Sequence, residues 1–541
     1  MRVPGRRPDG QGAAGAVEAA HVDGSYGDAS VTTLERDRTD GVTRPTGARR
    51  LVVPGLVGAV LVLAVLVRLR TASPLWLDEA LSVHIARLPL RGLHAALRQD
   101  GAPPVYYLLL HGWMRVFGQS VTAVRALSTV FALAALPVAW ALGRRWRGPS
   151  GGWTMLLLLA SSPFAAVYAT ETRMYALVTL EVLLGGLLLL RAWDRPSAPR
   201  LILLAVLTAV LVLTHYWSLF LLACLGLGLL RRARAPGSAR RLVLALVAGG
   251  GLALPWVPTL LFQVTHTGTP WAPAPSLVAA LDTVGAWAGG GTLAARVLAL
   301  LLMGLMVVAA VGRRHPSGLL LRLPADPAAR LLLGLWAGPL LLGLVVGIAA
   351  GSGYATRYSA IALPGALLLI AAGLHVLPRR SRLAWTAVVV VLGLVGALRV
   401  PFDDRKTQAG VIAAALRAGL VQGDLVVACP DQVGVAVQDL LPAGVDQVVY
   451  PTLQRPDRID WVDYARRNHA ADPRAFLARV LARAAGRPVW LITQGDYRTF
   501  GNDCQRLGAG LAEGHAVVSH PVKASKHFTE RADLFRYADP R

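Results

Sequence analysis

Long apolar segments alternate with shorter polar ones over most of this chain. About eleven of them have the length and hydrophobicity of helices that span a membrane. They are 51–69, 121–143, 153–168, 174–190, 201–217, 218–230, 242–261, 296–311, 331–350, 359–377 and 383–400. Two are short for a bilayer of about 30 Å: 153–168, which Ser161-Ser162-Pro163 can bend, and 218–230. The pattern predicts a polytopic, all-α membrane domain.

The pattern changes after residue 400, where charged residues become frequent and apolar runs shorten to strand length. Short apolar runs at 425–428, 448–450 and 489–492 alternate with stretches of helical spacing. Alternating strands and helices predict a small α/β domain. Residues 1–48 lack apolar periodicity and predict a disordered cytoplasmic tail. We therefore interpret the chain as a tail (1–48), a transmembrane domain (49–400) and an α/β domain (401–541).

The first polar segment, 70–120, is more than a linker. Apolar residues recur there at helical spacing, first at Leu77, Leu81, Ile85 and Leu88, then at Leu90, Leu93 and Leu97. We expect two short helices along the membrane surface, with a packed loop as the alternative.

Composition and charge place the chain in a membrane. The 541 residues are 54% hydrophobic, with a net charge of +24 that comes mostly from arginines between the apolar segments. This placement is typical of membrane topology and argues against nucleic acid as a partner. With the N-terminus in the cytoplasm, the inner loops carry eighteen Arg, whereas the outer loops after the first carry only Arg173 and Arg357.

This bias predicts a multi-pass protein of a bacterial plasma membrane. It places the loop 70–120, the turn 169–173, the loop 263–295 and the α/β domain outside the cytoplasm. Cys429 and Cys504 both lie in that domain, where they either form a disulfide or remain two buried thiols. We expect the domain to shape access of the acceptor.

Polar side chains gather at the predicted outer ends of the helices. The loop 70–120 supplies three carboxylates as catalytic candidates: Asp78, Glu79 and Asp100. The later turns supply candidates for binding a phosphate-bearing donor: Glu171, Arg173, Tyr175, His215, Tyr216, Arg357 and Tyr358. Carboxylates at a membrane boundary are costly to desolvate, which makes them functional candidates. The inner face has no comparable mixture, so we expect chemistry on the outside.

Each candidate also has a plainer interpretation. Asp78 and Glu79 suit the N-terminus of a surface helix, and Asp100 suits a turn before Pro-Pro. Glu171 and Arg173 suit a structural ion pair. The pair His215-Tyr216 suits an interfacial aromatic belt, and Arg357 an exposed positioning role.

An enzyme on the outer face has no access to cytoplasmic nucleotide sugars. A sugar carried on polyprenyl phosphate meets that need. Its transfer requires a carboxylate base to take the acceptor's proton and cations to stabilise the departing phosphate. Asp78 fits the first role, and Arg173 and Arg357 fit the second.

At these residues the chain resembles the GT-C integral-membrane glycosyltransferases of the protein O-mannosyltransferase and lipid A aminoarabinose transferase type. The matching pieces, in order, are Trp76-Leu77-Asp78-Glu79, Asp100 with Pro103-Pro104 and Tyr106-Tyr107, Phe117-Gly118, Arg125, Ser162-Pro163, Glu171-Thr172-Arg173-Met174-Tyr175, His215-Tyr216 and Arg357-Tyr358. The resemblance covers about 51–376 and leaves the α/β domain outside the shared core.

The resemblance implies that Asp78 activates the acceptor, with Glu79 in support. It also implies that Arg173 and Arg357-Tyr358 lie in regions that bind the lipid-phosphate sugar. One position departs from the family pattern: Ala102 stands where histidine is usual in Asp-x-His-Pro-Pro. That departure puts in doubt any role of this histidine in substrate contact or metal binding.

The sequence thus predicts an inverting glycosyltransferase. It would move a mannose- or pentose-like sugar from a polyprenyl-phosphate carrier to a glycan, lipid or protein acceptor, in contact with membrane lipid. No cofactor is certain, no metal ligand is assigned, and a divalent metal is compatible. A transporter is the alternative, although it predicts more charged residues within the helices than Glu181. A membrane-anchored binding protein would leave the outer acids unexplained.

Overall fold

The computed structural model describes residues 47–231, 237–269, 272, 275–315, 318–321, 327–351, 353–495, 498–514 and 517–538. The chain divides into two compact units, Met1–Pro54 and Gly55–Arg541. Residues 1–46 of the predicted tail lie outside the described residues. The fold below is that of the second unit.

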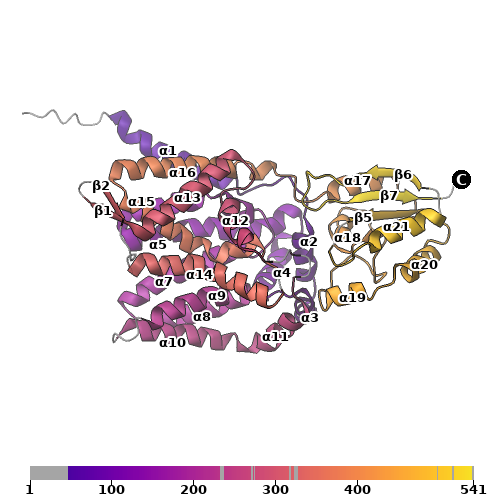
Figure 1. Ribbon diagram of the computed structural model, residues 1–541, viewed down its shortest axis with the longest axis horizontal. Coiled ribbons are helices and arrows are strands. Elements are labelled where there is room, and N and C mark those ends of the chain that lie inside the picture. Colours follow the sequence, from indigo (N-terminus) through magenta and orange to yellow (C-terminus); the bar gives the residue numbers. More distant parts are fainter. Residues whose placement is uncertain are drawn as a thin grey trace, which may run out of the picture. The chain divides into compact units, whose positions relative to one another are not determined.

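Helices make up the region that the apolar segments predicted (Figure 1). They are α1 (Gly47–Leu66), α5 (Val121–Ala160), α6 (Pro163–Ala169), α7 (Tyr175–Asp194), α8 (Ala198–Thr214), α9 (Ser218–Leu230), α10 (Ser238–Leu252), η1 (Leu254–Trp256), α11 (Val257–His266), α12 (Leu277–Trp287), α13 (Leu293–Val311), α14 (Pro327–Ala349), η2 (Thr356–Ile361), α15 (Leu363–Val376), α16 (Arg379–Ala397) and η3 (Val400–Phe402). A hairpin of β1 (Gly312–His315) and β2 (Gly318–Leu321) joins α13 to α14. All eleven predicted segments coincide with helices.

Within the described ranges, six helices are long and apolar enough to cross a membrane: 121–160, 175–194, 238–266, 293–311, 327–349 and 379–402. Shorter apolar helices, among them α8, α9 and α15, lie between them. The number of spans therefore stays a prediction. The bend at Ser161-Ser162-Pro163 is present, because α5 ends at Ala160 and the Ser162 hydroxyl caps α6 by accepting a bond from Ala165 N. A second break in α5 lies at Arg147 and Gly148, where Gly148 has a φ of 69°.

The loop 70–120 folds into short helices that lie between the long helices and the C-terminal region (Figure 1). The two predicted surface helices are α2 (Leu77–Ala86) and α3 (Leu90–Asp100). A third helix, α4 (Val105–Phe117), was not predicted. Gly101 ends α3 in the left-handed conformation (φ 83°), and Pro103-Pro104 then leads into α4.

The C-terminal region is the predicted α/β fold. Among the described residues it has a five-stranded sheet in the order β4-β3-β5-β7-β6. The strands are β3 (Leu425–Cys429), β4 (Asp446–Val449), β5 (Val489–Thr493), β6 (Val517–Val522) and β7 (Asp533–Tyr537), and the helices are α17 (Ala409–Gly419), α18 (Gln432–Gln438), α19 (Tyr464–His469), α20 (Pro473–Ala484) and α21 (Asp503–Gly514). Strand β3 runs parallel to β4 and β5, whereas β7 is antiparallel to β5 and β6. A Cys429–Cys504 disulfide joins β3 to α21.

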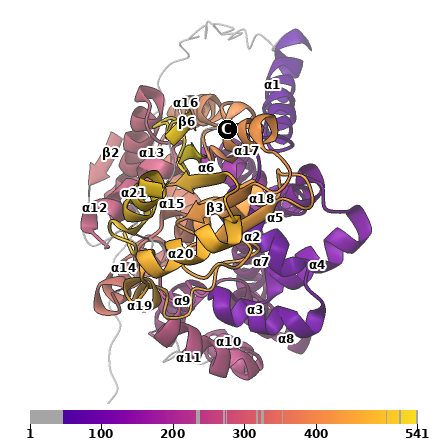
Figure 2. The same ribbon diagram turned by 90° about the vertical axis from the view of Figure 1, so that its right-hand side faces the viewer.

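Helix α2 packs against α18 of this region, and both views place the two helices side by side (Figures 1 and 2). His84 of α2 contacts the Asp439 carboxylate at 2.8 Å and the Asp457 carbonyl oxygen at 2.5 Å. Farther along, Trp461 N donates to the Gln99 carbonyl oxygen at 3.2 Å. The C-terminal region is thus bonded directly to the helices that carry the predicted catalytic residues.

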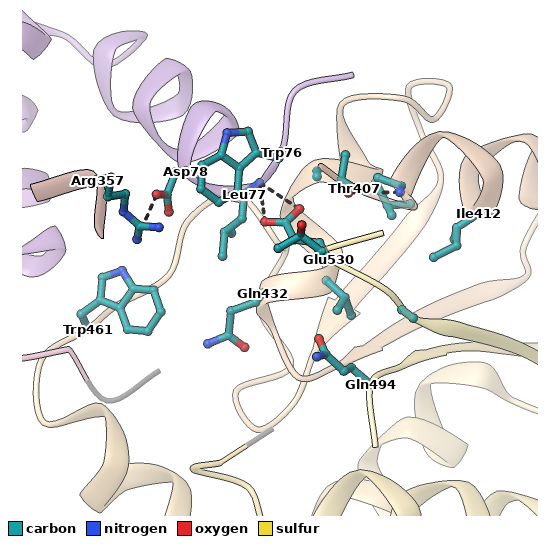
Figure 3. A pocket seen from close by; sticks show the side chains of 16 residues that line it. Trp76, Leu77, Asp78, Arg357, Thr407, Ile412, Gln432, Trp461, Gln494 and Glu530 are labelled. Carbon is teal, nitrogen blue, oxygen red and sulfur yellow. Dashed lines mark hydrogen bonds and ion pairs between the residues drawn. The ribbon is translucent and has the colours of Figure 1, made fainter. Parts of the chain in front are cut away.

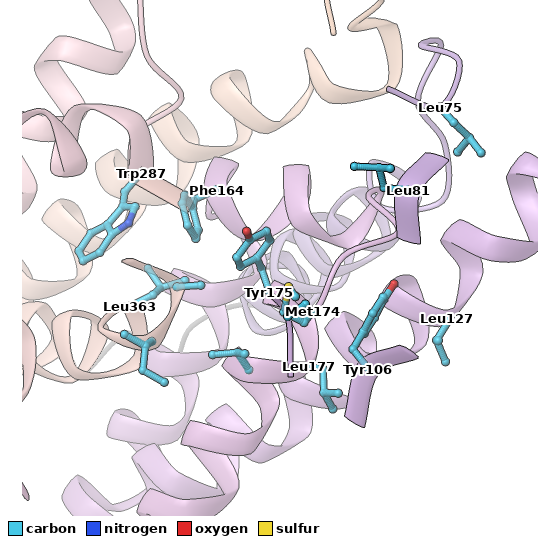
Figure 4. Close-up of a cluster of buried hydrophobic side chains, with 14 of the residues drawn as sticks. Leu75, Leu81, Tyr106, Leu127, Phe164, Met174, Tyr175, Leu177, Trp287 and Leu363 are labelled. Carbon is cyan, nitrogen blue, oxygen red and sulfur yellow. The ribbon is translucent and has the colours of Figure 1, made fainter. Parts of the chain in front are cut away.

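Aromatic side chains pack against one another in the buried core, among them Trp287, Phe164 and Tyr175 (Figure 4). Trp287 contacts Phe164, which contacts Tyr168, and Tyr168 contacts Tyr175, with ring centroids 6.2, 4.6 and 4.7 Å apart. Tyr175 then contacts His215 at 5.8 Å. Large rings at these spacings limit side-chain motion, so the core fixes the turns that carry the candidate site.

Candidate active site

Glu79 is held in a buried ion pair. Its carboxylate accepts bonds of 2.8 and 2.6 Å from Arg125 Nε and Nη2, and a third of 2.9 Å from Thr172 N. The glutamate is fully buried, and the guanidinium also donates to the carbonyls of Ser73 and Pro74. Burial opposes ionisation, but the bonds and charge of Arg125 hold the pKa of Glu79 below its ordinary value. This arrangement joins α2, α5 and the turn after α6.

Asp78, the neighbouring residue, faces a cavity instead. Its carboxylate lies 3.2 Å from Arg357 Nη2, and the two side chains are about one-sixth exposed. The Arg357 guanidinium carbon also lies 5.6 Å above the Trp76 ring and 5.7 Å from that of Tyr358. Residues 279 positions apart therefore meet, because α2 and η2 both begin at this surface.

Asp100 belongs to a second polar network beside Asp78. Tyr107 donates to its carboxylate at 3.1 Å, and Arg173 Nη1 donates to Tyr107 Oη at 3.4 Å. Arg173 also bonds Ser82 Oγ at 3.0 Å and the Asp78 carbonyl oxygen at 3.4 Å. Burial raises the pKa of Asp100 to about 6, partly offset by the charge of Arg173. Asp100 is thus more than a turn residue.

Glu171 does not pair with Arg173. Its Oε1 lies 2.9 Å from Lys406 Nζ, in the segment that leads into the C-terminal region. Both side chains are largely buried. Burial raises the pKa of Glu171, and the charge of Lys406 opposes that rise. Lys406 was not a candidate from the sequence, where a single lysine in a polar stretch carries no signal.

The remaining candidates divide between two places. His215 lies with Tyr175 and Tyr358, at ring-centroid distances of 5.8 and 5.4 Å. Tyr216 points elsewhere: it donates to the Gln263 side chain and accepts a 2.8 Å bond from Trp256. Although Tyr216 follows His215 in the sequence, its side chain does not lie with His215, Tyr175 and Tyr358.

The cavity beside Asp78 has a volume of about 320 Å³ (Figure 3). The start of α2 supplies Trp76, Leu77 and Asp78, η2 supplies Arg357, and the other lining residues lie after residue 400. Among these is Glu530, whose two oxygens accept bonds of 2.9 and 3.2 Å from Leu77 N (Figure 3). The first turn of α2 is therefore capped by Glu530 rather than by Asp78. Burial raises the pKa of Glu530 to about 8.

A metal site does not emerge from the described part of the chain, which holds no group of three or more His, Cys, Asp or Glu side chains able to bind a metal ion. The cations available to a bound phosphate are instead Arg173, Arg357 and Lys406. Arg357 lines the cavity with Asp78, whereas Arg173 lies in the neighbouring network with Tyr107 and Asp100, and Lys406 pairs with Glu171. Such a mixture can bind an anion and accept a proton at adjoining positions.

The fold is similar to that of solved structures of the GT-C type, and part of the sequence matches one family model. Residues 101–262 match the family model described as dolichyl-phosphate-mannose-protein mannosyltransferase. Solved structures similar to the chain include ArnT from Cupriavidus metallidurans in the apo state, with a TM-score of 0.58 and 13% identity. The same protein bound to undecaprenyl phosphate gives 0.57 and 14%. Each alignment covers 91% of this chain and 100% of that one. No curated protein sequence matches the chain.

These findings confirm the resemblance to GT-C enzymes of this type. Residues 1–400 are less than three quarters of the 541 residues, so the alignment with ArnT over 91% of the chain also includes part of the C-terminal region. That the core shared by the family ends before the α/β domain stays a prediction.

Proposed function

We propose that the protein is an inverting glycosyltransferase that uses a sugar carried on polyprenyl phosphate. The observation that carries the proposal is the pairing of Asp78 with Arg357 at 3.2 Å on the wall of a cavity. A base and an anion-binding group then stand side by side, as transfer from a lipid phosphate requires. The fold and the undecaprenyl phosphate bound to ArnT support a polyprenyl carrier.

The reaction is a single displacement. The acceptor hydroxyl gives its proton to a carboxylate oxygen of Asp78 while its oxygen forms a bond to the anomeric carbon of the sugar. The bond from that carbon to the phosphate oxygen breaks, and its electron pair leaves with polyprenyl phosphate. Attack opposite to the leaving group inverts the anomeric configuration. We expect a mannose- or pentose-like sugar.

The donor phosphate lies, in this proposal, between Arg357 and Arg173. Guanidinium groups engage phosphate oxygens in a planar fork, which suits charge that grows as the bond breaks. Tyr175 and Tyr358 contact the His215 ring on the same side, and these three side chains line the proposed donor site. Glu79 acts indirectly, because its bonds to Arg125 and Thr172 hold the start of α2 and hence Asp78.

The outer face is the proposed location of this chemistry. Two observations support it. Arginines are concentrated in the loops on the opposite side, and a Cys429–Cys504 disulfide lies in the C-terminal region. Disulfides persist in oxidising compartments such as the bacterial periplasm.

Replacing Asp78 by Asn tests the proposal. Purified protein receives radiolabelled polyprenyl-phosphate mannose or arabinofuranose, with a cell-envelope extract as the source of acceptor. Asn cannot take the proton, so transfer should fall about 10²-fold or more. Asp282→Asn, at an exposed position of α12, is the matched control and should retain activity. Near-normal transfer by Asp78→Asn would move the base to Glu79 or Asp100. A product that retains the donor's configuration would reject single displacement.

A further inference from the structure

The cavity beside Asp78 is built by two parts of the chain. Trp76, Asp78 and Arg357 line one side, and α17, α18 and the segments around Trp461, Gln494 and Glu530 line the other (Figure 3). Leu77 N donates to the Glu530 carboxylate and Trp461 N donates to the Gln99 carbonyl oxygen, and these bonds hold the two sides together. A molecule that reached Asp78 through this cavity would contact the C-terminal region.

Gln432 carries a buried oxygen that the fold leaves unused. Its side-chain nitrogen donates to Tyr464 Oη at 2.5 Å, and Tyr464 in turn donates to Asp431 at 2.5 Å. These two hydrogen bonds orient the Gln432 amide, so that its carbonyl oxygen is the atom without a donor. Gln432 is 6% exposed, and its Oε1 has no hydrogen-bond partner within the described ranges. A buried acceptor without a donor is unfavourable, and a ligand hydroxyl would satisfy it.

Other lining groups offer complementary bonds. The indole N–H of Trp76 is a buried donor that is likewise unpartnered by any described residue. The Gln494 amide also lines the cavity, and the Trp461 side chain adds an aromatic surface. The cavity lining therefore holds both donors and acceptors beside aromatic and aliphatic side chains.

We propose that this cavity is a saccharide subsite, in which Gln432, Gln494, Trp461 and Glu530 hold a sugar unit of the acceptor with a hydroxyl toward Asp78. Each sugar hydroxyl both donates and accepts, so one ring can meet an amide oxygen, an indole N–H and a carboxyl group at once. The apolar face of a sugar suits the tryptophan. A cavity of this size lies at the small end of ligand sites, roughly 300–1,000 Å³, and suits a terminal sugar unit.

A peptide acceptor fits less well. A serine or threonine brings a single hydroxyl, which leaves the other dispersed polar groups unmet. The inference rests on the proposed function, because the subsite is defined by an acceptor hydroxyl that points toward the Asp78 carboxylate. Binding can nevertheless be measured without turnover, so the two proposals can fail separately.

The test uses the full-length protein in nanodiscs and saturation-transfer NMR, which detects weak binding. The probes are methyl α-mannopyranoside and methyl α-arabinofuranoside, with the tripeptide Ala-Thr-Ala as the competing class. Gln432→Leu keeps the side-chain size but removes the amide, and Gln494→Ala is a second, less buried variant. Gln438→Leu is the matched control, because Gln438 ends the same helix outside the cavity and bonds Asp457.

We expect at least one glycoside to bind the native protein and Gln438→Leu equally. Affinity should fall about 3- to 10-fold in Gln432→Leu or Gln494→Ala, the equivalent of one neutral hydrogen bond. Unchanged glycoside binding in both variants, or binding of the tripeptide in place of the glycosides, would overturn the subsite. Asp78→Asn separates the proposals. If it binds glycoside and transfers normally, the proposed base fails while the subsite stands. If it abolishes transfer but no form binds glycoside, the subsite alone fails.

Discussion

Breaking the buried Glu79–Arg125 ion pair should lower the stability of the protein far more than removing an exposed arginine. Arg125→Leu removes two bonds of 2.6 and 2.8 Å and leaves a fully buried carboxylate with Thr172 N as its remaining donor. An uncompensated buried charge costs about 3–5 kcal/mol. The variant should therefore melt well below the native protein. Arg115→Leu, at an exposed position of α4, should change stability by no more than about 0.5 kcal/mol.

The second half of the test is rescue. Adding Glu79→Gln to Arg125→Leu replaces the stranded charge by a neutral amide, so the double variant should be more stable than Arg125→Leu. Thermal melting of the detergent-solubilised protein at a constant heating rate gives the order of the midpoints, with the double variant between the native protein and the single one. With Glu79→Gln alone as the fourth form, a double-mutant cycle isolates the coupling of the pair from effects on its neighbours.

The pH dependence of the same pair has a definite sign. Because Arg125 lowers the pKa of Glu79 in the folded protein, the stabilisation is fully present above the ordinary glutamate pKa of about 4.3. It is lost as the pH falls through the lowered value. Arg125→Leu should instead recover stability as the pH falls, because its stranded carboxylate then protonates. Equal midpoints for Arg125→Leu and the double variant at pH 7 would refute the reasoning.

Three further outcomes are expected. Arg173→Lys and Arg357→Lys should each weaken binding of polyprenyl phosphate about tenfold, because Lys keeps the charge but loses the fork; unchanged affinity in both would remove them from the donor site. Since burial raises the pKa of Asp100 to about 6, turnover should rise through pH 6 in the native protein, and Asp100→Asn should abolish that step; a step that persists in the variant belongs to another group. A reporter enzyme fused to the C-terminus should be active outside the cytoplasm, and activity inside would contradict the topology.

The candidate site shows how far local patterns reach. The sequence marks three residues as candidates because they lie where apolar segments end: Asp78, Arg173 and Arg357. The structure brings them to one surface. Lys406 carried no such signal. Tyr216 had the same signal as His215, yet its hydroxyl meets Gln263 and Trp256. The end of a helix specifies the depth of a residue but not the direction of its side chain.

The sequence by itself determined the eleven apolar helical segments of the membrane region and the strands β3, β4 and β5. Their apolar runs are long or periodic enough to need burial wherever the chain folds. Helices α4 and α12 and strands β6 and β7 escaped detection, since Tyr106-Tyr107 reads as part of a loop, α12 lies in the predicted loop 263–295, and β6 contains His520 and Pro521. Only the tertiary structure decided the partners of the site. Glu530 bonds Leu77 across 453 positions, and Gln432 reaches the cavity only because α18 packs on α2. Glutamates and glutamines are common on surfaces, so the meaning of these two lies in where packing places them.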